Sequence, residues 1–159
     1  MNLTNASSIT PFLWFDRNAE EAVDFYISIF PNSRKLGELR NTASDDPRMV
    51  PRGHVLTVSF ELDDLRFTAL NGGSVHPFTD AISFVVSCQT QEEIDRYWSK
   101  LTANGGSEVA CGWLKDRFGL SWQVVPARLP ELIQPAKAMQ AMMRMKKLDI
   151  AELEKAGKS

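Results

Sequence analysis

The sequence predicts an α+β protein made of two tandem βαβββ modules, with further helices after the second module. The first observation is an internal repeat: EEAVDFY at 20–26 resembles EEIDRYW at 92–98, at an offset of 72 residues. The second is a capping-box pattern before each segment, in which a short polar residue and a glutamate three positions later satisfy free amides at a helix start. The third is a short apolar stretch before each pattern, at 9–15 and 81–87. Each half is therefore expected to begin with a buried strand that leads directly into a helix.

The repeated segments have the spacing of helices with one buried face. Apolar residues recur at i, i+3, i+4 and i+7 in both. In matching order they are Ala22, Phe25, Tyr26 and Ile29, and then Ile94, Tyr97, Trp98 and Leu101. The capping pairs are Asn18 with Glu21 and Thr90 with Glu93. The same offset places Phe12 over Phe84 in the preceding strands. The two helices should superpose at this offset, and truncation of Phe25 should be costly if it is buried as expected.

Strand-like segments follow each predicted helix. The first half has them at 34–40, 55–62 and 65–70, with a polar loop over 41–52 and a tight turn at Asp63-Asp64. The second half has them at 108–115 and 120–125, after a helix stop at Asn104-Gly105-Gly106 and around a turn at Arg117-Phe118-Gly119. Both halves are therefore interpreted as βαβββ.

The length of 159 residues suits one domain of ordinary size. We expect a polar lead over 1–8, a single domain over 9–128 whose modules cover about 9–73 and 81–126, and a helical tail over 129–159.

The predicted tail contains a helix over 138–147 and a short final helix capped by Asp149 with Glu152. Methionines form one stripe of the longer helix, at Met139, Met142 and Met143. Such a stripe usually packs in a core or at an interface. A homodimer is expected, because open sheets and an apolar stripe both leave surface to bury.

Composition and charge exclude several classes of protein. Eighteen basic and twenty acidic residues give a net charge of −2, so generic nucleic-acid binding is not expected. No apolar run approaches the about twenty residues of a membrane span, and the start of the chain does not read as a secretory signal. Cys88 and Cys111 are interpreted as reduced thiols. We therefore expect a cytoplasmic protein without nucleic-acid or membrane partners.

Seven segments carry a resemblance to a known family. They are ITPFLWF at 9–15, NAEEA at 18–22, FY at 25–26, FPNS at 30–33, FTALNGG at 67–73, CGWLKDRFGLSWQVVP at 111–126 and MMRMKKLDI at 142–150. With these, the chain resembles the PhnB-like family, whose domain carries the label 3-demethylubiquinone-9 3-methyltransferase. That family lies in the vicinal oxygen chelate superfamily of glyoxalase I, extradiol dioxygenases and the fosfomycin- and bleomycin-resistance proteins. The resemblance implies curved mixed sheets that close around a cleft, usually in a homodimer.

The resemblance also implies a divalent metal, held by His, Glu or Gln side chains from the first and last strand of each module. In this sequence those places fall near Ile9 or Thr10, near Ala81 or Ile82, and at Thr68 and Gln123. Only Gln123 is a plausible donor, and one neutral amide does not hold a divalent ion. The usual metal centre is therefore expected to be absent.

Methyl transfer would require a site for S-adenosylmethionine. Such sites usually have a Gly-rich turn after a parallel strand and an acidic residue for the ribose. Asn71-Gly72-Gly73 and Asn104-Gly105-Gly106 are interpreted instead as strand and helix terminators. No cofactor is expected.

A cleft with aromatic walls remains as the candidate site. The expected ligand-binding residues are Trp14, Thr68, Trp113, Asp116 and Gln123. Gln123 should point into the cleft and Trp122 away from it, because strand residues alternate. Asp116 has a second interpretation as a turn-capping aspartate, and His76 is a further candidate acid or base. No catalytic residue is assigned.

Two functions remain at this stage. One is metal-independent binding of a small, partly aromatic molecule, as in the antibiotic-resistance relatives. The other is an enzyme of the superfamily on an unknown small substrate, either lyase- or dioxygenase-like or the methyltransferase that the label names.

Overall fold

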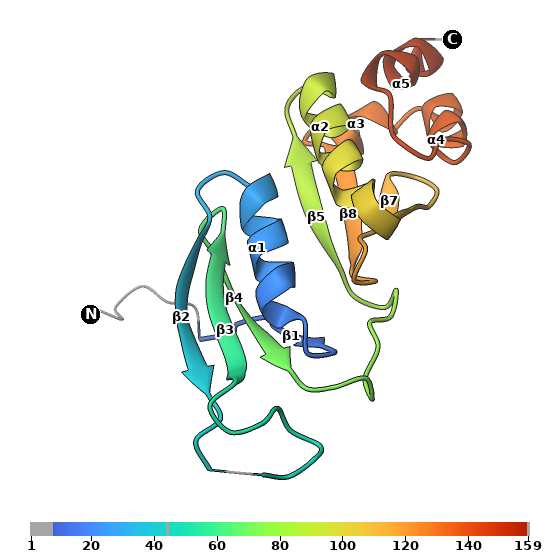
Figure 1. Ribbon diagram of the computed structural model, residues 1–159. Coiled ribbons are helices and arrows are strands. Elements are labelled where there is room, and N and C mark those ends of the chain that lie inside the picture. Colours follow the sequence, from blue (N-terminus) through green and yellow to red (C-terminus); the bar gives the residue numbers. More distant parts are fainter. Residues whose placement is uncertain (1–7, 44, 159) are drawn as a thin grey trace. The chain divides into compact units, whose positions relative to one another are not determined.

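The computed structural model describes residues 8–43 and 45–158. The chain divides into two compact units, one that ends at Pro77 and one that begins at Phe78. Each unit has its own four-stranded sheet and its own helix on that sheet (Figure 1). The C-terminal tail belongs to the second unit.

The first unit has the predicted βαβββ order. Its elements are β1 (Phe12–Phe15), α1 (Ala19–Ile29), β2 (Arg34–Arg40), β3 (Val55–Leu62) and β4 (Leu65–Asn71). The strands lie in the order β1-β4-β3-β2, with β1 parallel to β4 and the other pairs antiparallel. The hairpin between β3 and β4 turns at Asp63 and Asp64, both of which have a positive φ as a two-residue turn requires.

The second unit repeats this topology and adds the tail. Its elements are β5 (Ser83–Cys88), α2 (Gln91–Thr102), η1 (Ala103–Gly105), β6 (Ser107–Glu108), β7 (Trp113–Lys115), β8 (Ser121–Pro126), α3 (Leu129–Leu132), α4 (Ala136–Met142) and α5 (Ile150–Gly157). The strand order is β5-β8-β7-β6, with β5 parallel to β8. The predicted α+β class and the duplicated βαβββ module are confirmed. None of the described helices has the length and apolar character needed to cross a membrane.

The repeat has one offset in the helices and another in the strands. Ala22, Tyr26 and Ile29 are buried in α1, as are Ile94, Trp98 and Leu101 in α2, at the predicted offset of 72. In the first strands, however, the outward-facing residues are Phe12, 59 % exposed, and Val85, 56 % exposed, at an offset of 73. The placement of Phe12 over Phe84 is therefore wrong by one residue, because the second unit has one residue fewer between strand and helix.

The core of the first unit is an aromatic stack under α1. Tyr26 is fully buried, and its ring lies parallel to that of Phe60 at 6.4 Å between centroids. Phe60 in turn stacks on Phe67 at 5.3 Å. Phe25, by contrast, is only half-buried. Tyr26 is therefore the residue of α1 whose truncation removes most of the core.

The start of α1 is held differently from the capping box that the sequence predicts. The Asn18 side chain does not cap the helix. Instead, the buried Asn71 at the end of β4 accepts a hydrogen bond from the Ala19 amide at 2.9 Å and donates one to Glu20 at 2.6 Å. In α2 the expected cap is present, since Thr90 Oγ1 accepts from the Glu93 amide at 3.2 Å.

The predicted strand over 108–115 is interrupted. Residues 109–112 leave the sheet in a turn in which Cys111 and Gly112 both have positive φ. Their amides donate to the carbonyls of Met145 and Lys146, each at 2.8 Å. A side chain at position 112 would meet the Val124 carbonyl at 2.9 Å, so glycine is needed where the tail docks.

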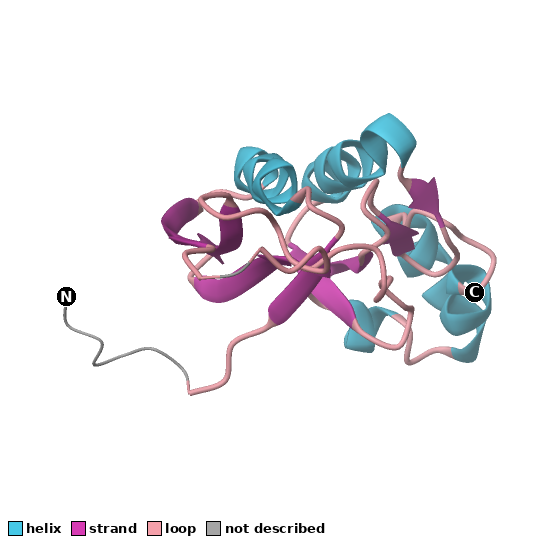
Figure 2. Cartoon of the chain, turned by 60° about the horizontal axis from the view of Figure 1, so that its bottom comes forward, coloured by secondary structure: helices cyan, strands magenta, loops and turns pink. Residues whose placement is uncertain are grey.

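The tail consists of short helices joined by turns (Figure 2). The helix expected over 138–147 runs only over Ala136–Met142 in α4. Residues 143–148 instead form turns whose carbonyls meet the Cys111–Gly112 amides. The capping of α5 is as predicted, since Asp149 accepts from the Glu152 amide at 2.9 Å.

Candidate functional site

The five predicted site residues fall into three groups. In each unit one sheet face packs against the helix, and we call the opposite face the helix-free face. Leu13, Phe15, Phe67 and Ala69 are buried on the helix side of the first sheet. Strand alternation therefore places Trp14 and Thr68 on the helix-free face.

The helix-free face of the second sheet carries Trp113 and Gln123, which are directly opposite each other across β7 and β8. Both are half-buried, whereas Trp122 and Val124 are buried on the helix side. The predicted direction of Gln123 agrees with this alternation. Its amide nitrogen donates to the Ser83 hydroxyl of β5 at 2.9 Å.

Asp116 lies on neither face, because it holds the turn between β7 and β8. It is 3 % exposed. One carboxylate oxygen accepts from the amides of Phe118 and Leu120 at 2.9 and 3.1 Å, and the other accepts from the Trp122 indole at 2.9 Å. These contacts are those of the turn-capping interpretation.

The donor set of a superfamily metal can be tested against the strand register. Thr68 lies opposite Phe12, and Gln123 lies opposite Val85. Phe12 and Val85 have no donor atom in their side chains, so each of these strand pairs offers a single neutral side-chain oxygen, from Thr68 or from Gln123. Within the described residues, moreover, no group of three or more His, Cys, Asp or Glu side chains could hold a metal ion. The residues present do not fit the metal that the superfamily implies.

A hollow of about 540 Å³ lies beside Trp14 in the first unit. We call it the Trp14 hollow; it is lined by Trp14, Arg17, Asp46, Pro47, Arg48, Met49, Gly72, Gly73, Ser74 and Val75. The Trp14 indole donates to the Gly73 carbonyl at 2.7 Å, and the ring of His76 meets it edge-on at 4.7 Å between centroids. The aromatic wall is thereby fixed in place.

Residues 46–49, from the connection between β2 and β3, supply part of the lining of the Trp14 hollow. Buried Asn41 closes this loop: its amide donates to the His54 carbonyl at 2.9 Å, and its side chain donates to the Val50 carbonyl at 2.7 Å. These bonds tie the two ends of the connection together. The Asp, Pro and Ser content of this segment predicts only a polar loop and gives no sign that it lines a hollow.

Gly72→Ala should open the Trp14 hollow. An added Cβ would lie 2.2 Å from Trp14 Cε2, so the indole would have to leave its position. The indole N–H should then lose its bond to Gly73, which would appear as a large shift of its NMR resonance. Gly37→Ala is the matched control, since nothing lies within 4 Å of its added Cβ. An unchanged Trp14 resonance in the first variant would contradict this packing.

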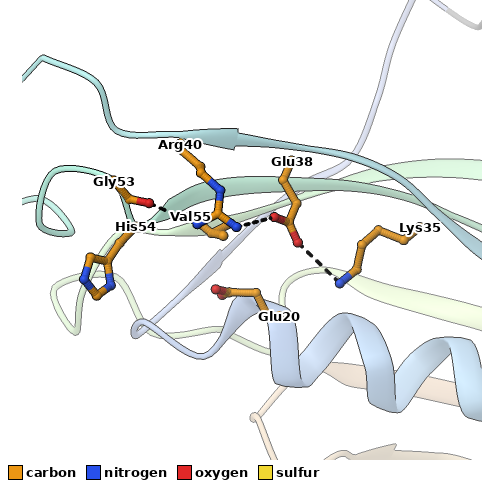
Figure 3. A pocket seen from close by; sticks show the side chains of 7 residues that line it. All are labelled: Glu20, Lys35, Glu38, Arg40, Gly53, His54 and Val55. Carbon is orange, nitrogen blue, oxygen red and sulfur yellow. Dashed lines mark hydrogen bonds and ion pairs between the residues drawn. The ribbon is translucent and has the colours of Figure 1, made fainter.

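A second, more polar hollow of about 420 Å³ lies between α1 and the edge of β2 (Figure 3). It is lined by Glu20, Lys35, Glu38, Arg40, Gly53, His54 and Val55. Glu38 lies between Arg40 at 3.0 Å and Lys35 at 3.5 Å, and Arg40 also donates to the Gly53 carbonyl at 3.0 Å. These charges largely satisfy one another.

The two histidines and two cysteines have separate surroundings. His54 lies at the rim of the polar hollow and His76 beside Trp14, so they do not share one site. Both cysteines are free. Burial raises the pKa of the Cys88 thiol to about 11, so that thiol is not an activated nucleophile near neutral pH.

A family model described as 3-demethylubiquinone-9 3-methyltransferase matches residues 7–125. The chain belongs to this PhnB-like family. A PhnB protein from Bacillus cereus is 33 % identical, with a TM-score of 0.66, over 76 % of this chain and 100 % of that one. No curated protein matches the sequence.

Solved structures with lower identity share the fold of this PhnB-like chain. Protein PA1353 from Pseudomonas aeruginosa has a TM-score of 0.59 at 20 % identity, over 75 % of this chain and 96 % of that one. The fosfomycin resistance protein FosX from Listeria monocytogenes, solved with Mn(II) and a sulfate ion, has a TM-score of 0.51 at 17 % identity, over 79 % of this chain and 94 % of that one. The fold of the PhnB-like chain is that of the vicinal oxygen chelate superfamily.

Proposed function

We propose that this PhnB-like protein binds a small, partly aromatic molecule without the divalent metal of its superfamily. The observation that carries the proposal is the Trp14 hollow. Its volume, about 540 Å³, lies in the range of ordinary small-molecule sites. A fixed indole provides flat apolar surface that an aromatic ring can cover.

The metal-independent part of the proposal follows from the donor set. FosX, which shares the fold, was solved with Mn(II). In this chain the paired strand positions carry Phe12 with Thr68 and Val85 with Gln123. Neutral hydroxyl and amide oxygens compensate poorly for the hydration that a divalent ion loses.

The purified protein should therefore carry no stoichiometric divalent metal, and Gln123→Glu alone should not create a tight site. A single added carboxylate at position 123 still faces Val85 and supplies one ligand where several are needed. Plasma emission analysis measures the metal content, and calorimetry with Mn²⁺ measures the affinity of the variant. A content of about one metal ion per chain that is lost in Gln123→Ala would contradict metal-independent binding. It would favour the alternative function, an enzyme of the superfamily.

Titration with one- and two-ring compounds tests the proposal directly. The readout is the set of indole N–H resonances, with Trp14 identified by its loss in Trp14→Phe. The Trp14 resonance should shift saturably, while that of Trp122, bonded to Asp116 in the core, should not. If no compound shifts Trp14, or if binding maps to Trp113, the assignment of the site is wrong.

We also propose a homodimer in the cytoplasm. Apolar side chains exposed in one chain support the dimer, among them Phe12 and Leu39, each 59 % exposed, and Met143, 65 % exposed. Two free thiols suit a reducing compartment. The expected ligand is a small molecule, and neither a nucleic acid nor a membrane is proposed as a partner. Light scattering that shows a monomer at micromolar concentration would contradict the dimer.

A further inference from the structure

Charged side chains gather along one wall of the Trp14 hollow. Arg48 pairs there with Asp46, with Nη2 to Oδ2 at 2.6 Å and Nε to Oδ1 at 3.0 Å. These hydrogen bonds lower the pKa of Asp46 to about 2, so its carboxylate stays ionised near neutral pH. The pair therefore carries no net charge, and the charge that remains in the lining is the positive charge of Arg17.

Arg17 has spare hydrogen-bonding capacity at this wall. Its Nη2 donates to the Pro47 carbonyl at 3.4 Å, a long hydrogen bond. Among the described carboxylates, none forms an ion pair with it. A guanidinium has five N–H donors in a planar fork that matches the two oxygens of a carboxylate. Most of these donors remain open to a ligand.

The backbone at Arg17 is held in an unusual conformation. Its φ is +59°, in the left-handed region that arginine rarely adopts. Most other non-glycine residues with positive φ in the described chain are Asn or Asp, which adopt this region more readily. Strained residues of this kind concentrate at binding sites, where the fold holds a side chain in a required direction.

The rest of the lining is suited to a flat apolar body. Trp14 provides the aromatic wall, and Pro47, Met49 and Val75 provide aliphatic surface. A ring that covers these groups would bring a substituent at its edge to the wall where Arg17 lies. The lining thus combines one aromatic surface with one unbalanced cation.

We infer that the ligand of the Trp14 hollow is a small aromatic acid, whose ring packs on Trp14 and whose carboxylate binds Arg17. This rests on the proposed function, because it names the chemical class of the molecule bound at that same site. A carboxylate that meets a guanidinium with two hydrogen bonds gains both charge attraction and orientation.

A matched pair of probes tests the inference: 2-naphthoate and the neutral 2-naphthamide. Both are followed through the Trp14 indole resonance and by calorimetry. The acid should bind the wild-type protein about tenfold more tightly than the amide, the difference expected for one charge-assisted contact. Raising the salt concentration should weaken the binding of the acid and leave the affinity for the amide unchanged.

Arg17→Asn removes the charge proposed to bind the carboxylate without disturbing the fold. Asparagine suits the left-handed backbone better than arginine, so the variant should unfold at the same temperature or higher. Its affinity for 2-naphthoate should fall to that for 2-naphthamide, which itself should not change. Arg66→Gln removes the same charge from β4, outside the hollow, and should leave both affinities as they are.

The outcomes distinguish the two proposals. If neither probe shifts Trp14, the proposed binding function at this site fails. If both probes bind equally well, or if Arg17→Asn keeps the preference for the acid, the hollow binds aromatic molecules but the inference about the acid is wrong.

Discussion

Tyr26→Ala should lower the free energy of unfolding by about 3–5 kcal/mol, the cost of removing a large side chain from a packed core. Tyr26 is fully buried on α1 and stacks on Phe60, which stacks on Phe67 of β4. Its removal therefore leaves a cavity under the helix and separates the helix from two strands. Urea denaturation followed by circular dichroism measures the change.

Phe25→Ala is the matched control on the same helix. Phe25 is only half-buried, so its truncation should cost roughly half as much. Equal losses in the two variants would contradict the burial pattern of α1. The spacing in the sequence admits both residues to the buried face, and only the packed structure separates them.

Asp116→Ala should lower the free energy of unfolding by about 2–5 kcal/mol, the largest loss expected in the second unit outside its apolar core. It leaves the amides of Phe118 and Leu120 and the indole of Trp122 without their shared acceptor. Buried donors that lose a charged acceptor cost the fold more than the bonds themselves contribute. Chemical denaturation measures the loss.

Trp122→Phe is the control for Asp116, because it removes the indole donor and keeps the two amide bonds of the turn. It should cost less than Asp116→Ala. Normal stability of Asp116→Ala would contradict the turn-capping role and leave Asp116 available as a ligand residue of the second unit.

Local signals explain which parts of the fold are predictable from the sequence. The bounds of β2 and β3 match the predicted ranges, and the Asp63-Asp64 turn forms with both residues at positive φ. The last strand of the second unit is also placed to within one residue. In each case the signal lies in neighbouring residues: an alternating pattern, a turn dipeptide or a helix stop.

The errors come from contacts between residues far apart in the chain. The start of α1 depends on Asn71, which follows Ala19 by 52 residues. The break in the predicted strand at 109–112 depends on the carbonyls of Met145 and Lys146. The candidate site has the same character, because residues 46–49 and 72–75 come to Trp14 only in the folded first unit. The periodicity of apolar residues along the chain does not predict such contacts.

The connection between the second and third strands differs between the two βαβββ units. Between β2 and β3 it is the long loop over 41–54, and between β6 and β7 it is the short turn over 109–112. After a duplication, two copies of such a connection can diverge independently, because it lies beyond the ends of the strands. In the first unit this connection lines the Trp14 hollow, while in the second unit it holds the end of the chain through the Cys111 and Gly112 amides. A chimera that exchanges these connections would show whether binding capacity can be moved from one repeat to the other.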